Sequence, residues 1–330
     1  MSQLLIKEMD LASKEVNAAI YSILADSQGP RTIYNASKHL IGAGGKRIRP
    51  FLTLKTCEIV GGESEDAIPI AASIELIHTF TLVHDDIMDG DDTRRGIATV
   101  HVLWGIPLAI IAGDMLFAKA YEITSRAKTS PHRLLKILAT VTDATISICE
   151  GQTLDILFEK RRDVSEKEYL DMVYKKTGAL LEAAAKAGAL VGGGMSHQVK
   201  SLGELACYAG LAFQIVDDVL GLTADEKTLG KPIGSDIREG KSTILIIHAL
   251  KHANMSQRQK ILSVLGDRTA RPHQIKTIIQ MIRNLGSIEY AIKKSETLIE
   301  EAKDKLSSFP PSQSKDMLLE LCDYLTSRKY

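Results

Sequence analysis

The sequence predicts an all-α protein built as a single domain. Hydrophobic residues recur with the helical period in nearly every segment, whereas signals for strands are weak. The 330 residues are long enough for one large domain or two ordinary ones. No proline-rich or low-complexity linker divides them and no repeat of fixed period is present, so a single domain spanning residues 1–330 is favoured.

The expected helices are bounded by glycine and proline. They cover residues 5–24, 36–41, 50–60, 69–89, 107–128, 131–158, 166–192, 198–222 and 239–266, and amphipathic segments continue to Tyr330. The turn Gln28-Gly29-Pro30 ends the first helix, and the glycines of 42–45 end the second. Pro50 and Pro69 are expected in first turns, where the missing N–H costs nothing.

Three of these helices are apolar or small-sided on most faces. They include the segments Ala71–Leu82, Ala179–Val191 and Leu205–Leu222. Helices of this kind are buried in the middle of a large bundle or in a subunit interface.

Composition excludes several classes of protein. Forty-one basic residues balance 41 acidic ones, which argues against a broad electrostatic surface for nucleic acid. The four cysteines form no CxxC pair and are expected to be reduced thiols, not a zinc site or a disulfide framework. The N-terminus lacks the apolar region of a signal peptide, and the longest uncharged stretch, 97–113, is too short to span a membrane. We therefore expect a cytoplasmic protein that does not bind nucleic acid and is not an integral membrane protein.

A first acidic cluster, His84-Asp85-Asp86-Ile87-Met88-Asp89, ends the fourth expected helix. Asp85 and Asp89 are four residues apart, about 40° around a helix axis. Their carboxylates repel one another and lie at the negative end of the helix dipole, which favours a bound cation. Hard oxygen ligands at this spacing suit Mg²⁺, and a solvated acidic helix end is the alternative interpretation.

A second cluster, Gln214-Ile215-Val216-Asp217-Asp218, lies inside an otherwise apolar helix. Gln214 shares a helix face with the two aspartates at i+3 and i+4. Polar side chains in such surroundings must be paired, hydrated or bound to a metal, and a capped surface patch is the weaker alternative.

Basic residues accompany both clusters. Gly44–Pro50 places three cations on a glycine-rich turn that enters a helix, an arrangement suited to phosphate. Arg94-Arg95-Gly96 follows the first acidic cluster, and Lys175–Gly178, Lys231 and Lys241 flank the second. Each of these alone would be a solvated face, but together they describe a site for magnesium and diphosphate.

With these residues the chain resembles a trans-isoprenyl diphosphate synthase, the family that makes geranyl, farnesyl and geranylgeranyl diphosphates. The motifs match in the family's order: GGKRxRP at 44–50, DDxxD at 85–89 with RRG at 94–96, GQxxD at 151–155, KTG at 176–178, and the second aspartate-rich motif at 214–218 with lysines at 231 and 241. One such motif would be weak, whereas six in register are specific. The resemblance implies the isoprenoid-synthase helical bundle around a central apolar cavity.

The resemblance also implies the roles of the metal ligands. Asp85 and Asp89 would coordinate two Mg²⁺ ions with Asp86 in support, and Asp217 would coordinate a third, giving three per active site. The family's second motif often ends in a further aspartate, where this chain has Gly221. Archaeal-type members share that glycine, so we do not interpret it as a loss of activity, although one carboxylate fewer is expected nearby.

The substrate residues follow from the same resemblance. The allylic diphosphate would be bound by the metal ions together with Arg94, Lys176, Lys231 and Lys241. Isopentenyl diphosphate would be held by Lys46, Arg49, His78 and Arg95. Thr177 and Gln214 would lie near the allylic carbon and, with Lys176, are the catalytic candidates. His78, seven residues before Asp85, shares its helix face; a neutral core histidine is the alternative.

The implied reaction is an ionisation, a condensation and an elimination. Stabilisation of the departing diphosphate lets the allylic C–O bond ionise, the double bond of isopentenyl diphosphate attacks, and a proton leaves to the diphosphate. The protein supplies electrostatics, orientation and exclusion of water, without a side-chain nucleophile.

Product length is set in the family by bulk at the positions four and five before the first aspartate, here Thr81 and Phe80. One aromatic residue without an insertion resembles archaeal-type geranylgeranyl diphosphate synthases, with C20 products. Phe80 lies roughly 140° around an ideal helix from Asp85, so its role depends on the resemblance. A farnesyl or longer-chain synthase is the alternative.

Three other functions compete with this prediction. A terpene cyclase would not need Lys46 and Arg49, and its second metal motif is usually of Asn/Ser/Glu type. A non-catalytic partner subunit of a heteromeric synthase would tend to lose the aspartates and arginines that this chain keeps. A helical scaffold would leave Asp217 and Asp218 unexplained. As in the family, a homodimer is expected.

Overall fold

The structure is a computed structural model and describes residues 2–25, 29–224 and 233–326. Lys231, expected at the allylic diphosphate, lies outside the described residues. The chain divides into two compact units. The first comprises residues 1–145, 180–203 and 306–321, and the second comprises 146–179, 204–305 and 322–330.

The all-α prediction is confirmed. Within the described ranges the strands form one short hairpin, in which β1 (Thr93–Arg94) pairs antiparallel with β2 (Ile97–Ala98). Each strand has two residues. This hairpin was not expected from the sequence. It holds the Arg94-Arg95-Gly96 segment as a tight turn, with Arg95 and Gly96 both at positive φ.

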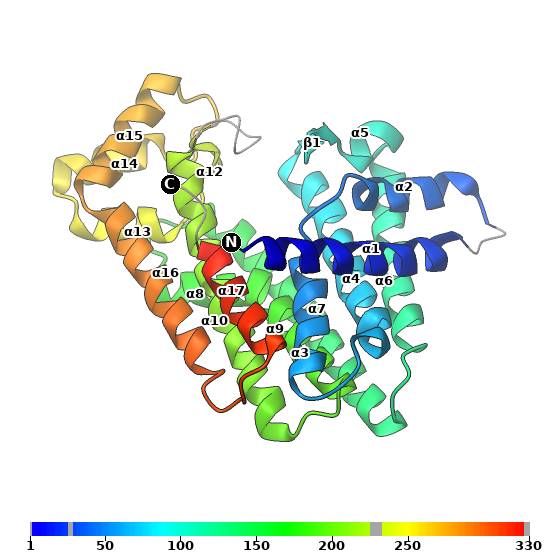
Figure 1. Cartoon of the computed structure of the whole chain (residues 1–330). Coiled ribbons are helices and arrows are strands. Elements are labelled where there is room, and N and C mark those ends of the chain that lie inside the picture. The colour runs from blue at the N-terminus through cyan, green and yellow to red at the C-terminus, as the bar shows by residue number, and fades with distance from the viewer. Residues whose placement is uncertain (1, 26–28, 225–232, 327–330) are drawn as a thin grey trace. The chain divides into compact units, whose positions relative to one another are not determined.

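In the first unit α4 (Ser64–Asp89) packs against several other helices (Figure 1). The helices of this unit are α1 (Gln3–Ala25), α2 (Arg31–Gly42), α3 (Ile48–Ile59), α5 (Val100–Trp104), α6 (Ile106–Thr124), the start of α7 (Pro131–Phe158), most of α9 (Ala179–Val191), the start of α10 (Ser196–Thr223) and most of α17 (Gln313–Thr326). α6, α3 and α1 all contact α4. Burial explains this position, because the segment Ile70–Ile77 has no residue more than 2% exposed.

The end of α4 presents the first acidic cluster. Gly90 follows the helix in the left-handed conformation at φ 71° and donates its N–H to the Asp86 carbonyl oxygen. Glycine adopts this conformation without a Cβ penalty, so the helix stops here. The last turn therefore carries the three aspartates Asp85, Asp86 and Asp89.

The second unit is built around α13 (Ile244–His252), which packs against α16 (Ser287–Asp304), α15 (Pro272–Asn284) and α8 (Glu166–Val173) (Figure 1). Its other elements are the end of α7, the π-helical turn η1 (Tyr174–Gly178), most of α10, α12 (Ser235–Glu239), α14 (Met255–Val264) and the end of α17. A capping box starts α8: the Ser165 side chain accepts from the Glu168 N–H, and the Glu168 carboxylate accepts from the Ser165 N–H.

Some expected boundaries were wrong. α4 begins at Ser64, so Pro69 lies inside the helix and not in its first turn. Glu65 and Asp66 in the first turn favour the earlier start, because carboxylates stabilise the positive end of a helix. α2 likewise begins at Arg31, earlier than the expected residue 36.

Two long expected helices are divided. The segment 166–192 forms α8, η1 and α9, with the π-helical turn at the Lys-Thr-Gly motif. The segment 239–266 forms α13 and α14, separated by Ala253 in an extended conformation. Asn254 then caps α14 in a reciprocal pair with Gln257, a sequence signal that could have located this break.

Two helices, α4 and α10, are long and apolar enough to cross a membrane by length and composition alone. In each the apolar window is 61% buried inside the protein, and the core helix of a soluble protein passes the same test. These helices are therefore weak indicators of a membrane span.

Candidate active site

A buried arginine supports the glycine-rich loop of the first unit, at residues 44–50. Arg47 is 3% exposed and its guanidinium lies 2.9 Å from the Glu75 carboxylate on α4. It also donates to Asn17 Oδ1 and to the carbonyl oxygens of Ile41 and Gly44. Arg47 therefore stabilises the loop, and its exposed neighbour Lys46 remains at the surface.

Arg95 joins the hairpin to this loop. Its guanidinium donates to the Gly44 carbonyl oxygen. A Cβ atom on Gly45 would lie 2.7 Å from Arg47 Nη1 and 2.9 Å from Arg95 Nη1, and Gly45 has φ 143°. The conformation and the close approach together require glycine here. Two sequence motifs 50 residues apart thus meet at one cationic surface.

His78 lies among these cations on α4. Its ring is partly exposed but densely surrounded by protein atoms, and this desolvation is the main cause that lowers its pKa well below 6.5. The positive charges of Arg49, Arg95, Arg94 and Arg47 lower the pKa further. His78 is therefore neutral at ordinary pH, and of the four expected isopentenyl diphosphate residues the structure brings Arg49, His78 and Arg95 into one electrostatic group.

The first aspartate-rich motif has one inward and two partly exposed carboxylates. Asp86 is 1% exposed, and its Oδ1 lies 2.5 Å from Arg94 Nε. Burial raises the pKa of Asp86, and Arg94 opposes that rise. Arg94 also lies 3.5 Å from Asp91, so the structure places this expected phosphate ligand on the acidic motif. Asp85 and Asp89 are half-buried at the end of α4.

Phe80 belongs to a row of rings between α4 and α6. Its ring centroid lies 5.5 Å from that of Phe117 and 5.0 Å from that of His84, and Phe117 lies 5.0 Å from Tyr121. Thr81, the other chain-length candidate, turns its hydroxyl to the His78 carbonyl oxygen of its own helix. Phe80 is thus braced by α6, whereas Thr81 is not part of the aromatic row.

The second unit contains a cavity of about 100 Å³ that gathers the catalytic candidates. Lys176 and Thr177 from η1 and Gln214 from α10 line it together with Lys241. Phe158, Met172 and Val173 give part of the wall an apolar surface. The cavity therefore combines cations, hydroxyl and amide groups with a water-excluding side.

A chain of hydrogen bonds crosses this cavity. Thr177 Oγ1 donates to Gln214 Oε1 at 3.1 Å, and Gln214 Nε2 donates to Asp218 Oδ1 at 3.0 Å. The Tyr169 hydroxyl donates to Asp218 Oδ2 at 2.7 Å. Burial, followed by the negative charge of Asp236, raises the pKa of Asp218 to about 7. Burial also raises the pKa of Tyr169, which stays protonated and able to donate.

Lys176 is placed by α7. Its Nζ lies 2.6 Å from the Asp155 carboxylate, which joins the KTG and GQxxD motifs. A Cβ on Gly151 would lie 2.3 Å from the Lys176 backbone nitrogen, so only glycine lets α7 approach η1 this closely. Beside it Gln152 is 8% exposed, and neither amide atom has a hydrogen-bond partner among the described residues.

The position of Gly221 is not short of negative charge. Asp236 from α12 places Oδ2 3.2 Å from where a Cβ of Gly221 would be. Asp217 precedes Gly221 by one turn on the same face of α10. The motif itself has one carboxylate fewer, as expected, and a residue outside it places a carboxylate beside this position.

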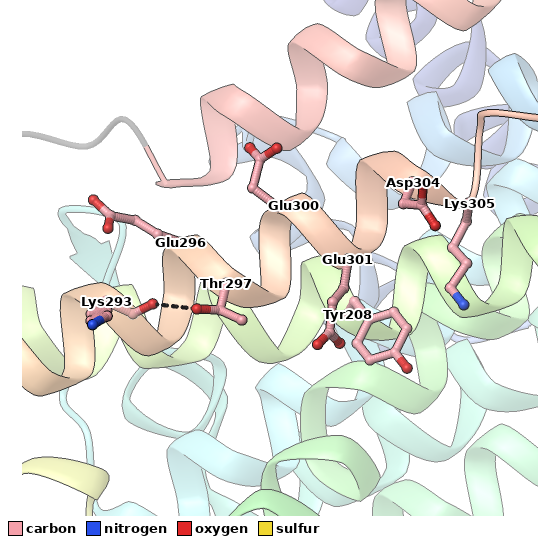
Figure 2. A pocket seen from close by; sticks show the side chains of 8 residues that line it. All are labelled: Tyr208, Lys293, Glu296, Thr297, Glu300, Glu301, Asp304 and Lys305. Carbon is pink, nitrogen blue, oxygen red and sulfur yellow. Dashed lines mark hydrogen bonds between the residues drawn. The ribbon is translucent and has the colours of Figure 1, made fainter.

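A second hollow in this unit is unsuited to diphosphate. Figure 2 shows it along α16, with the carboxylates of Glu296, Glu300, Glu301 and Asp304 at its walls. Lys293 and Lys305 are its cations, and Lys305 lies 3.0 Å from Glu204 and 5.4 Å from the ring centre of Tyr208. The excess of carboxylates would repel a phosphate group.

Sequence reasoning missed Tyr169, Glu75 and Asp236. None belongs to a motif that carries obvious chemistry, and each acts through a contact distant in sequence. Glu75 alone had a readable signal, since a carboxylate inside the apolar segment 71–82 must have a buried partner.

Comparison with known proteins identifies the chain. The polyprenyl synthetase family matches residues 30–282. Geranylgeranyl diphosphate synthase of Methanosarcina mazei is 42% identical over all of both chains, and geranylfarnesyl diphosphate synthase of Aeropyrum pernix is 43% identical over 91% of this chain and 95% of its own. The crystal structure of geranylgeranyl pyrophosphate synthetase from Pyrococcus horikoshii superposes with a TM-score of 0.94 at 40% identity, covering 99% of both chains.

The fold and these matches define a prenyltransferase of the all-α isoprenoid-synthase type. The chain belongs to the polyprenyl synthetase family and is a trans-prenyl diphosphate synthase. The resemblance drawn from its motifs is confirmed.

Proposed function

We propose that the protein is a geranylgeranyl diphosphate synthase, which condenses isopentenyl diphosphate with dimethylallyl, geranyl and farnesyl diphosphates. The observation that carries the proposal is the cationic group of the first unit, where Arg49, His78 and Arg95 gather beside the glycine-rich loop. Such a group suits a diphosphate, and a helical scaffold does not require it.

Magnesium fits the acidic residues of both units. Within the described residues no three His, Cys, Asp or Glu side chains form a cation site alone. Mg²⁺ keeps several waters and takes phosphate oxygens as ligands, so one or two carboxylates suffice. Asp85 and Asp89 would hold two ions and Asp217 a third. When bound, magnesium supplies positive charge that stabilises the departing diphosphate.

The chain's own residues orient the reaction. Lys46, Arg49 and Arg95 bind isopentenyl diphosphate, and neutral His78 contributes a hydrogen bond without adding charge. Lys176 and Lys241 face the cavity of the second unit, where they neutralise phosphate charge. Thr177 and Gln214 present oxygen dipoles to the developing allylic cation. The apolar wall excludes water from that cation.

The C20 product is proposed from Phe80. Its ring is held between α4 and Phe117, so it is a rigid obstacle for a growing prenyl chain. Replacement of Phe80 by alanine would open this obstacle and lengthen the product. An unchanged product from Phe80→Ala would remove Phe80 as the determinant of length.

The test of the function is a product assay. Purified protein with Mg²⁺ and isopentenyl diphosphate is given dimethylallyl, geranyl or farnesyl diphosphate in turn, and the prenyl chains are sized. A dominant C20 product from all three supports the proposal. C15 or C25 and longer products keep the enzyme class and exclude the length assignment. Failure with every starter favours a non-catalytic partner subunit.

A homodimer is proposed from an apolar face of the first unit. Val102, Leu103, Ile106, Ile110 and Ile111 on α5 and α6 are each 42–52% exposed. These residues lie on two helices that contact one another, and exposed apolar residues gathered in this way mark an interaction surface. Light scattering that gives the mass of one chain would contradict the dimer.

A cytoplasmic location is proposed from the four free cysteines, since free thiols suit a reducing compartment.

A further inference from the structure

Tyr169 is the largest fully buried side chain in the cavity of the second unit. Its ring is 1% exposed and its hydroxyl lies 2.7 Å from Asp218 Oδ2. A buried phenol needs a partner for its O–H, and here the partner is a carboxylate of the second aspartate-rich motif. Tyr169 lies on α8, outside every motif of the chain.

Both oxygens of Asp218 are occupied. Oδ2 accepts from Tyr169, and Oδ1 accepts from Gln214 Nε2 at 3.0 Å. Asp218 is 7% exposed, so these two donors replace the water that its carboxyl group loses on burial. The adjacent Asp217 is half-buried, so the two aspartates have different surroundings.

The carboxylate determines how the Gln214 amide is oriented. Because the Tyr169 hydroxyl donates to Oδ2, Oδ1 is the acceptor that Asp218 offers to Gln214, and the amide nitrogen faces it. The amide oxygen then faces the other way and accepts from Thr177 Oγ1 at 3.1 Å. If Asp218 turned, the amide could rotate and present its N–H groups where the oxygen now lies.

We propose that Tyr169 is a positioning residue, which through Asp218 holds the Gln214 oxygen and Thr177 in the orientation that favours an allylic cation. The inference rests on the proposed function, in which Gln214 and Thr177 face the reacting carbon. Asp218 is accordingly an anchor for Gln214, and the metal-facing aspartate of this motif is Asp217 alone.

The test removes one oxygen atom. In Tyr169→Phe the ring and its packing remain, but Oδ2 of Asp218 loses its donor. We expect kcat for condensation to fall about tenfold, because small displacements of positioned groups slow such steps strongly. KM for isopentenyl diphosphate should not change, since the residues proposed to bind it are not members of this chain of hydrogen bonds. A lowered melting temperature with wild-type kcat would assign Tyr169 a structural role only.

Tyr290→Phe is the matched control. Tyr290 also donates its hydroxyl to a carboxylate, Glu166 Oε2 at 2.6 Å, in the same unit but outside the cavity. We expect kcat to remain at the wild-type value in this variant. An equal loss of kcat in both variants would overturn the proposal, because it would report a general effect of removing a tyrosine hydroxyl that donates to a carboxylate.

Asp218→Asn alone provides an independent measurement if Tyr169→Phe folds poorly: kcat should also fall about tenfold, and a wild-type kcat would overturn the proposal. Where both variants fold, the double variant adds a further test. Both substitutions disrupt one chain of hydrogen bonds, so their effects on kcat in the double variant should be clearly less than the product of the two single effects. Multiplicative effects would overturn the proposal.

A readout without catalysis separates this inference from the proposed function. In protein labelled with ¹⁵N-glutamine, the side-chain amide signal of Gln214 is assigned by its absence in Gln214→Leu. The signal should shift in Tyr169→Phe and stay in place in Tyr290→Phe. If the wild type condenses no substrate, the proposed function fails while this shift still supports the hydrogen-bond chain. An unmoved signal overturns the positioning role whether or not the protein is active.

Discussion

The two aspartate-rich motifs each contain a buried carboxylate, and they satisfy it with different partners. Each contains adjacent aspartates of which one is buried: Asp86 at the end of α4 and Asp218 in α10. In the first unit the buried carboxylate is neutralised by an arginine, since Arg94 lies 2.5 Å away. In the second it is satisfied by two uncharged donors, Tyr169 and Gln214.

The difference shows what each motif must leave in place. In the first motif the positive charge of Arg94 compensates the negative charge of Asp86. The buried carboxylate therefore does not offset the cations that dominate the nearby surface around Arg49 and Arg95. The neutral donors of the second motif add no positive charge, so burial raises the pKa of Asp218 to about 7, and its carboxyl group orients an amide. In both motifs the buried aspartate acts inside the protein, and the half-buried neighbour is the one able to meet a cation.

The largest expected effect is therefore at the half-buried aspartates. Asp85→Asn and Asp217→Asn keep size and shape but remove a charge from the proposed magnesium ligands. We expect the rate of condensation to fall by a factor of about 10² to 10³ in each, with little change in melting temperature. Steady-state kinetics at saturating Mg²⁺ measures this. A wild-type rate in either variant would break the division between inner and outer aspartates.

The buried aspartate of the first motif should act mainly on stability. Asp86→Ala leaves Arg94 with only the more distant carboxylate of Asp91, at 3.5 Å, and loss of one member of a buried pair is strongly destabilising. The Arg94 side chain is 22% exposed, so water recovers part of this loss and we expect a cost of about 2 kcal/mol. Urea unfolding measures it. Arg94→Leu combined with Asp86→Ala should cost less than Asp86→Ala alone, and an equal or greater cost contradicts the pairing.

A backbone contact of the second unit gives a smaller effect. Gly151→Ala would place a methyl group 2.3 Å from the Lys176 nitrogen, so α7 or η1 must move. Overpacking of this kind costs about 1–3 kcal/mol, and the displaced Lys176 should lower the condensation rate. Gly42→Ala is the control, because its Cβ would meet only the Tyr21 hydroxyl, at 3.5 Å. Equal stabilities of the two variants by thermal unfolding would exclude the close approach.

Much of this fold could be predicted from the sequence because its signals are local. Helical periodicity and glycine turns define most helices, and the motifs predict Lys46, Asp85 and Gln214 as site residues. The division of 239–266 was misjudged because long helical periodicity conceals a cap. The partners within the site, such as Tyr169 with Asp218, are 49 residues apart. Their contact arises from tertiary packing, which no local pattern encodes.

The smallest expected effect concerns pH and the cations of the first unit. The folded-state pKa of His78 is lowered well below 6.5 by burial and by the surrounding arginines, so the unfolded chain binds its proton more readily. Stability from this group is complete above pH 6.5 and is lost as the pH falls below that value toward the lowered folded pKa. One such group changes the free energy of unfolding by at most about 1.4 kcal/mol per pH unit. Glutamine cannot titrate, so His78→Gln should reduce the pH dependence of the free energy of unfolding between pH 6.5 and 5, measured by urea unfolding. If the slope of the unfolding free energy against pH were unchanged, the ring would take up a proton equally in the folded and unfolded states. The arginines would then not surround His78 as closely as the structure indicates.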